Sequence, residues 1–208
     1  MNKKKAFERF KRPSWDEIFM FQAISCAVRH SCLKRGVGAV LVKDKRIIST
    51  GYNGAAVGIT NCKELGYCYY EKLAQKEVAI NSSNFSEIKE KFKIYCHAVH
   101  AEANALSQCS RTEAKGATFY LTNYPCPRCT QDSIITNEIA AVRVWKDYLE
   151  NPALGIDEKR ASEKKLLEAG ISVGYISISK KRIMEIAYYM ANVIGERTDY
   201  KFGKRRCK

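Results

Sequence analysis

Long apolar runs are missing from this 208-residue sequence. No segment reaches the roughly 18 consecutive uncharged apolar residues that a membrane-spanning helix requires, so we expect no membrane partner. The first residues, MNKKKAFERFKR, also lack the apolar segment of a signal peptide. No internal repeat is visible. These absences favour a cytoplasmic protein, and the length is sufficient for one compact domain with additions.

Acidic side chains are scarce relative to basic ones. The sequence has 22 Asp and Glu against 36 Lys and Arg, which gives a formal net charge of +14. Residues 1–12 carry six basic residues and one acidic residue, and residues 201–208 carry five basic residues and no acidic one. The remaining residues therefore carry a charge of only about +4, which suits a nucleotide site as well as a nucleic-acid groove. Nucleic-acid binding through the basic tails is an alternative that we do not favour.

The nine cysteines do not suggest a disulfide framework. Their number is odd, the chain is not small, and no secretion signal is evident. Reduced thiols and metal ligands are the better interpretation, and the spacing of the cysteines has to distinguish between them.

Hydrophobic periodicity predicts an α/β fold. Apolar residues follow helical spacing from Trp15 to Arg29, and two apolar runs, Val37–Val42 and Ile47–Thr50, flank a charged turn as in a β-hairpin. Further on, strands and helices alternate, which is typical of helices packed on a mixed sheet. We therefore expect a three-layer αβα sandwich around a mixed five-stranded sheet. The later strands are expected at 117–121, 140–145 and 171–178, with helices beginning at about Ala101, Cys126 and Glu158.

Three regions are expected along the chain. Residues 1–13 form a basic tail, and residues 14–178 form the main domain. Within it, the polar segment 69–95 is rich in Lys and Glu, has weak helical character, and is interpreted as an insertion. Residues 179–208 comprise a C-terminal helix and a second basic tail.

One histidine and two cysteines have the spacing of a metal site. Cys126 and Cys129 are separated by two residues at a predicted helix start, where the exposed amides and the helix dipole favour thiolates. His100 would open another helix and add a nitrogen ligand. Three ligands leave the fourth position of a tetrahedral zinc open, which is what a catalytic zinc needs.

Glu102 lies two residues after His100 and is not needed as a ligand. This placement lets its carboxylate face an attacking water and act as a proton shuttle. Each motif alone is weak, because a lone Cys-x-x-Cys is compatible with a structural zinc, a redox pair or two buried thiols. Together, in this order and with Pro125 before the first cysteine, they match the His-x-Glu and Pro-Cys-x-x-Cys signature of zinc-dependent nucleobase deaminases.

Beyond this signature, the chain resembles the deoxycytidylate (dCMP) deaminase family of the cytidine deaminase superfamily. The resemblance covers about residues 14–178, and it implies a cytidine deaminase-like fold. It also implies hydrolysis of dCMP to dUMP and ammonia, which feeds dTTP synthesis. The stretches that carry it are CLKRGVGAVLVKDKRIISTGYNG (32–54), NCKELGYC (61–68), CHAVHAEANAL (96–106), GATFYLTNYPCPRC (116–129) and LLEAGISV (166–173).

The resemblance also assigns roles to individual residues. It implies that His100, Cys126 and Cys129 hold zinc and that Glu102 carries the proton. It further implies that Asn53 hydrogen-bonds the nucleotide, that the Ala101 amide meets the pyrimidine carbonyl oxygen, and that Tyr124 flanks the ring. Without the resemblance, Asn53 is simply a turn residue. Members of the family are often hexamers, activated by dCTP and inhibited by dTTP with Mg²⁺ on the effector, so we expect a homo-oligomer.

Some positions depart from the family pattern. Ala56 stands where proline is usual, and Asn137 and Glu138 replace a small-residue turn. These departures concern the shape of loops and not the zinc chemistry.

Four further cysteines lie outside the catalytic signature, beside predicted loops or element ends. Four thiolates complete a closed structural zinc site, which would fasten the insertion to the first helix, and some family members carry such a zinc near these positions. His97 could replace Cys68 as a ligand. The alternative is that all four are ordinary buried thiols. The four are Cys32, Cys62, Cys68 and Cys96.

Two other functions compete with this assignment. The first is deamination of a polynucleotide or a free nucleoside by the same chemistry. The second is a zinc-stabilised nucleic-acid-binding module with no catalysis. Against the second, a structural site gains nothing from a non-ligating Glu102 beside an open zinc position.

Overall fold

The computed structural model describes residues 10–146 and 155–192. It divides the chain into two compact units, one of residues 15–178 and one formed by the two ends of the chain, residues 1–14 and 179–208. Most of both basic tails, including Cys207, lies outside the described residues. No helix in the described part of the chain is long and apolar enough to span a bilayer.

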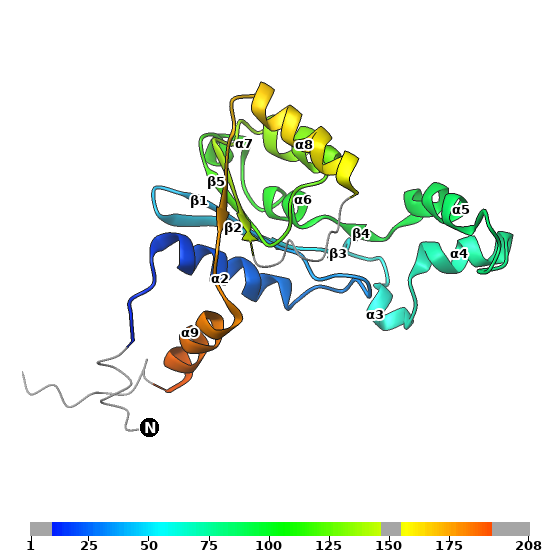
Figure 1. Cartoon of the computed structure of the whole chain (residues 1–208), viewed down its shortest axis with the longest axis horizontal. Helices are drawn as coiled ribbons and strands as arrows, with labels where there is room; N and C mark the ends of the chain where they lie inside the picture. The colour runs from blue at the N-terminus through cyan, green and yellow to red at the C-terminus, as the bar shows by residue number, and fades with distance from the viewer. Residues whose placement is uncertain (1–9, 147–154, 193–208) are drawn as a thin grey trace, which may run out of the picture. The chain divides into compact units, whose positions relative to one another are not determined.

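A five-stranded sheet organises the larger unit, in the order β2-β1-β5-β6-β7 (Figure 1). Strand β1 pairs antiparallel with β2 and β5, whereas β5, β6 and β7 run parallel. The sheet is therefore mixed, as predicted from the hairpin followed by alternating strands and helices. The strands are β1 (Gly38–Lys43), β2 (Arg46–Tyr52), β5 (Thr118–Leu121), β6 (Ala141–Trp145) and β7 (Ser172–Ile176).

Helices cover both faces of this sheet, which confirms the predicted three layers (Figure 1). Successive side chains of β1 point to opposite faces of the sheet. Ala39 and Leu41 belong to the core that includes residues of α6, whereas Val40 points to the other face. Helix α2 covers the second face and buries Phe19, Met20 and Ala23. The helices around the first face are α6 (Ala101–Leu106), α7 (Arg111–Ala114), η2 (Cys129–Ile135) and α8 (Ile156–Glu168), and α2 is Trp15–Ala27.

The helix predicted from Cys126 differs from an ordinary α-helix. Residues Cys129–Ile135 form a π-helix, in which the Thr136 N–H donates to Gln131 O at 3.2 Å, five residues back. A π-turn contains one extra residue and often occurs at functional sites. Composition carries no signal for it, so sequence patterns predict only a helix here.

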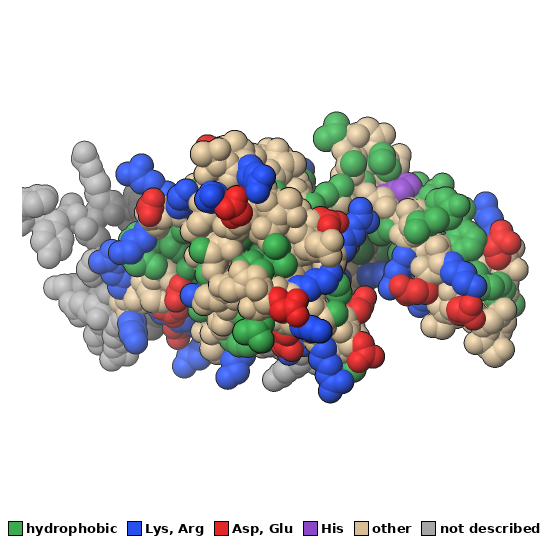
Figure 2. All heavy atoms as spheres, turned by 90° about the horizontal axis from the view of Figure 1, so that it is seen from above, with side chains coloured by type: hydrophobic (Ala, Val, Ile, Leu, Met, Phe, Trp, Pro, Cys, Tyr) green, Lys and Arg blue, Asp and Glu red, His purple; other side chains and the backbone are tan. Residues whose placement is uncertain are grey.

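The insertion forms short helices that pack on one another. These are α4 (Tyr69–Glu77), α5 (Phe85–Lys91) and the 3₁₀ turn η1 (Phe92–Tyr95), and α3 (Cys62–Leu65) precedes them. Tyr70 and Ala74 are buried, whereas Ile80 and Ile94 remain exposed. Green apolar side chains mixed with charged ones are visible at the insertion's end of the molecule in Figure 2.

A two-residue ladder joins the segments that lead into the site. Strand β3 (Gly54–Ala55) follows Asn53, strand β4 (Ala98–Val99) precedes His100, and the two pair antiparallel. In the smaller unit, helix α9 (Lys180–Asn192) carries Tyr189, whose ring stacks on Phe10 with centroids 3.9 Å apart.

Candidate active site

His100 and Glu102 are placed by the first turn of α6. His100 is the N-cap residue, with extended backbone angles, and its carbonyl accepts from the Asn104 N–H at 2.9 Å. Glu102, two residues later, points into the protein and is 5% exposed. A histidine at the cap and a glutamate in the first turn can therefore face one cavity from the same helix end.

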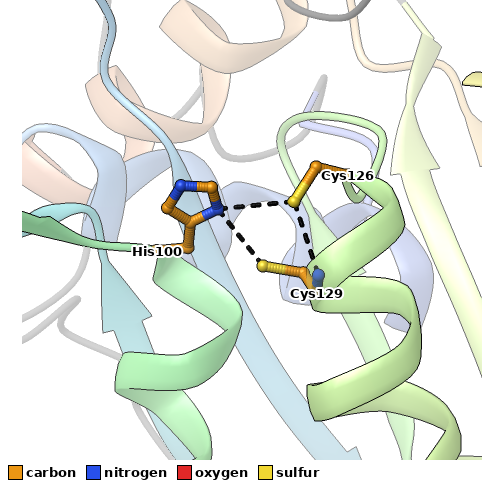
Figure 3. Close-up of side chains that lie close together, drawn as sticks. All are labelled: His100, Cys126 and Cys129. Carbon is orange, nitrogen blue, oxygen red and sulfur yellow. Dashed lines mark hydrogen bonds between the residues drawn. The ribbon is translucent and has the colours of Figure 1, made fainter. Parts of the chain in front are cut away.

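Cys126 and Cys129 lie at the start of the helical segment that contains η2. Their side chains lie close to the His100 ring (Figure 3). His100 Nδ1 lies 3.2 Å from Cys129 Sγ and 3.6 Å from Cys126 Sγ. Ligand atoms of the three residues lie within 4.8 Å of one another. One imidazole nitrogen and two sulfurs at this separation fit the donor set and geometry that zinc prefers. Within the described ranges, no other group of three such side chains meets this distance.

Electrostatics favour a thiolate in this cluster. Hydrogen bonding from the Cys129 side chain, together with His100 and the Cys129 N–H, lowers the pKa of Cys126 to about 4 against the opposing effect of burial. The same hydrogen bond and burial raise the pKa of Cys129, so in the metal-free cluster one thiol keeps its proton. Hydrogen bonding to Cys126 also raises the pKa of His100. The predicted stabilisation of a thiolate at the helix start therefore has a physical cause.

Glu102 lies in an environment that favours its protonated form. Burial raises the pKa of Glu102, and this effect exceeds the opposing contributions of the helix amides and His100. A raised pKa brings a carboxyl closer to neutral pH, where it can both accept and return a proton.

A cavity of about 380 Å³ opens beside this cluster. Its lining includes His100, Glu102 and Cys126, and all three residues for which substrate contacts are predicted: Asn53, Ala101 and Tyr124. Sequence patterns did not indicate several other lining residues, because these come from loops or from the insertion and belong to no recognisable motif. They are Arg35, Tyr70, Lys93, Asn123 and Glu158.

The side chain of Asn53 also holds the loop before β1. Its Nδ2 donates to Arg35 O at 2.9 Å, and its Oδ1 accepts from the Val37 N–H at 2.8 Å. One N–H and one acceptor lone pair remain for a ligand. Asn53 therefore has a structural role in the loop, and the predicted nucleotide contact stays a prediction.

The ring of Tyr124 lines the cavity, but its hydroxyl is buried. No described residue accepts a hydrogen bond from that hydroxyl, and burial raises the pKa of Tyr124. Lys159 of α8 lies over the ring, 5.6 Å from its centroid. Tyr124 thus lies at the cavity wall, and the predicted contact of its ring with a substrate stays a prediction.

Helix α6 is fixed to the sheet by two contacts. Asn104 Nδ2 donates to Tyr52 O at 2.8 Å. Gly51 lets β2 approach the helix, since a Cβ on Gly51 would lie 2.2 Å from Ala101 O. The positions of His100 and Glu102 therefore depend on a glycine in the neighbouring strand.

The sulfurs of the four cysteines proposed for a structural zinc are too far apart to bind one metal ion as they stand. Cys32, Cys62, Cys68 and Cys96 contain no three sulfurs within 4.8 Å of one another. They do share a neighbourhood. Burial raises the pKa of Cys96, the nearby Cys32 and Cys62 raise it further, and Cys62 also acts on the pKa of Cys68. His97 Nδ1 contacts Thr60 O at 2.9 Å, and its ring stacks on Tyr69.

Comparison with known proteins agrees with the fold and the metal cluster. The model of the cytidine and deoxycytidylate deaminase zinc-binding region matches residues 13–145, and the chain belongs to this family. It is 40% identical over 119 residues to the deoxycytidylate deaminase of Mycobacterium phage D29, covering 57% of this chain and 85% of that protein. It is 33% identical over 181 residues to the Saccharomyces cerevisiae deoxycytidylate deaminase, covering 86% of this chain and 50% of the yeast protein.

Two further relatives match most of the chain. ComE operon protein 2 of Bacillus subtilis is 29% identical over 195 residues, covering 91% of this chain and 87% of that protein. The crystal structure of the cyanophage S-TIM5 dCMP deaminase with dCMP and dUMP shares the fold. Its TM-score is 0.53 at 23% identity, with 80% of this chain and all of that chain covered.

Proposed function

We propose that this protein hydrolyses dCMP to dUMP and ammonia, with zinc held by His100, Cys126 and Cys129. The observation that carries the proposal is the position of Glu102, a buried carboxyl that lines the same cavity as two residues of the metal cluster. Several relatives are deoxycytidylate deaminases, and this supports the choice of substrate.

Each residue around the cavity has a separate role in the proposed hydrolysis. A zinc ion in the cluster supplies a Lewis acid that lowers the pKa of water. Glu102 accepts the proton that water loses as its oxygen attacks the pyrimidine C4, and delivers it to the ring nitrogen. The carboxyl then carries the proton of the hydroxyl added at C4 to the amino group, and the C4–N bond breaks to release ammonia and leave the C4 carbonyl. The Ala101 amide donates to the pyrimidine carbonyl oxygen, and the ring of Tyr124 flanks the base.

Ammonia release from dCMP, deoxycytidine and cytosine in a single-stranded oligonucleotide tests the proposal directly. We expect kcat/KM for dCMP to exceed that for deoxycytidine by at least about a hundredfold, because two charge-assisted contacts to a phosphate suffice for this. Equal efficiency on dCMP and deoxycytidine, or preference for the oligonucleotide, would contradict the assignment and favour the competing substrates.

Two variants separate proton transfer from metal binding. Glu102→Gln should keep zinc, measured by elemental analysis, and lose at least about a hundredfold in turnover, since general acid–base groups contribute this much. Cys126→Ala should lose zinc and activity together, because two protein ligands rarely hold the ion. Normal turnover in Glu102→Gln would refute the proton-carrier role.

A second, structural zinc bound by Cys32, Cys62, Cys68 and Cys96 is part of the proposal. The proximity of Cys32 and Cys62 to Cys96, whose pKa they raise, supports it, although binding would require the sulfurs to move closer together. We expect two zinc ions per chain by elemental analysis and one in Cys32→Ser, with a lower melting temperature. One zinc in the unmodified protein would remove the second site.

Regulation and assembly are finer parts of the same proposal. Activation by dCTP, inhibition by dTTP with Mg²⁺ on the effector, and a hexamer stay predictions from the family resemblance. Ammonia release with each nucleotide, with and without Mg²⁺, tests the first two. Light scattering coupled to size-exclusion chromatography tests the hexamer. A rate unaffected by either nucleotide, or a monomeric mass, would contradict them.

A further inference from the structure

Helix α8 is joined to the segment that carries the two cysteines of the metal cluster by the side chain of Lys165. Its Nζ donates to Gln131 Oε1 at 2.7 Å and to Pro127 O at 3.4 Å. Pro127 lies between Cys126 and Cys129 in the chain, and Gln131 belongs to the π-helix η2. One ammonium group therefore connects the turn between the two cysteines to the first turn of the helix that follows it.

The packing of α8 determines where this ammonium lies. Ser162 and Leu166 are fully buried, and Lys165, three residues after Ser162, is half-buried on the same side of the helix. Further towards the start of α8, Lys159 lies 5.6 Å from the centroid of the Tyr124 ring. This side of α8 therefore contacts the chain both before the Cys-x-x-Cys turn and within it.

Lys165 differs from the other basic residues of α8 in its partners. Those three form ion pairs with acidic residues of the same helix: Lys159 with Glu163, Arg160 with Asp157 and Lys164 with Glu168. Within residues 10–146 and 155–192, Lys165 has no carboxylate partner, and both of its hydrogen bonds end on neutral oxygens. Its positive charge is therefore not neutralised by a neighbour, and it attracts the two thiolates that a bound metal requires. In a partly buried region this attraction is stronger than between exposed groups.

We propose that Lys165 is a positioning residue of the zinc site, which holds the turn from Cys126 to Cys129 in place and stabilises its thiolates by charge. The inference rests on the proposed function, in which these cysteines and His100 hold zinc. Groups that orient metal ligands typically change metal affinity by about 10–100-fold. Lys165 is not among the described residues that line the cavity, so it acts through the ligand residues and not on the substrate.

Zinc affinity in matched lysine variants tests this assignment. Lys165→Met keeps the apolar stem but removes the ammonium, and we expect the Kd for zinc, measured by competition with a chelator, to rise at least about tenfold. Lys165→Arg should recover most of the affinity, because it keeps the charge and the hydrogen-bond donors. The same titration of Cys126→Ala identifies any zinc that binds elsewhere in the chain.

Lys164→Met is the matched control. This neighbouring side chain is 78% exposed and pairs with Glu168, so its loss should change the Kd for zinc by less than about twofold. An unchanged Kd in Lys165→Met, or an equal loss of affinity in Lys164→Met, would overturn the proposal.

The absorption spectrum of the cobalt-substituted protein separates a role at the metal from general support of the fold. Removal of a cation beside a thiolate raises the energy of the sulfur electrons, so the thiolate-to-cobalt charge-transfer band should move to longer wavelength in Lys165→Met. The band should not move in Lys164→Met. A residue that only supports the fold would weaken binding and leave the spectrum of the bound ion unaltered, so an unshifted band in Lys165→Met would also overturn the proposal.

Neither measurement depends on turnover. If the unmodified protein binds zinc but does not deaminate dCMP, the proposed substrate and reaction fail, and the zinc affinities still decide the role of Lys165. If dCMP is deaminated and Lys165→Met binds zinc like the unmodified protein, only the role of Lys165 is wrong.

Discussion

Replacing Gly51 by alanine should damage the active site from the far side of α6. A Cβ at this position would lie 2.2 Å from Ala101 O and 2.5 Å from Ala105 N. Both contacts are backbone atoms of the helix, so no side-chain rotation can relieve them. The strand and the helix must separate by about 1 Å to restore ordinary van der Waals distances.

The expected magnitudes follow from this displacement. Overpacking of a well-packed core costs about 1–3 kcal/mol, so the free energy of unfolding should fall by this amount. The helix carries His100 at its cap and Glu102 in its first turn, and a 1 Å misplacement of catalytic groups can cost about a hundredfold in rate. Urea unfolding of the metal-free protein measures the first effect, and ammonia release from dCMP with zinc present measures the second.

Gly174→Ala in β7 provides the control. There the added Cβ would meet only the flexible side chain of Arg143, with the nearest atom 3.1 Å away. We expect a change in stability within about 0.5 kcal/mol and an unaltered rate. Gly51→Ala with normal stability and activity, or equal losses in both variants, would refute the reasoning that the β2–α6 distance sets the position of the catalytic groups.

Three further predictions concern Glu102, Tyr120 and Lys34. Burial raises the pKa of Glu102 in the folded protein. Protonated Glu102 therefore contributes its full stability at a pH below its pKa in the unfolded chain, and this contribution is lost as the pH rises through its pKa in the folded protein. Urea unfolding of metal-free Glu102→Gln should therefore match that of the unmodified protein at about pH 4 and exceed it at about pH 8, and a pH-independent difference would contradict this. Tyr120→Phe removes a 2.6 Å hydrogen bond to Asp16 that joins the sheet to α2, and should lower the free energy of unfolding by about 1.5–3 kcal/mol in urea; no change would contradict it. Lys34→Met should increase amide hydrogen exchange in residues 69–95, because it removes the bonds to Tyr70 and Glu71, and unchanged exchange would show that the insertion is held by other contacts.

The sequence was sufficient to predict the sheet and the metal cluster. His100 and Cys126 each occur near the start of a helix, and their spacing to Glu102 and Cys129 is a local signal that matches a known signature. The hairpin from Val37 to Thr50 was predictable because its two apolar runs and the charged turn between them are close in the sequence. These signals depend on neighbours in the sequence, and they do not require the rest of the fold.

The remainder of the cavity depends on contacts between distant segments. Arg35 is brought to the site by Asn53, 18 residues away, and Tyr70 and Lys93 by the docking of the insertion. No local pattern distinguishes these residues from ordinary polar surface residues. Cys32, Cys62, Cys68 and Cys96 were grouped only because they lie outside the catalytic signature. In the structure they lie near one another, but their sulfurs do not have the spacing of metal ligands.

The π-helical turn makes the length of this segment as important as its composition. Cys129 at its start must face His100, while Ile134 and Ile139 must reach the core, and the Ile139 N–H bonds Ile134 O five residues back. Deleting one residue between Cys129 and Ile134 would rotate everything beyond the deletion by about 100° about the helix axis. Either the thiol or the isoleucines would then face the wrong side. Exposed positions such as Asp132 can accept substitutions, but the turn should not tolerate a change of length.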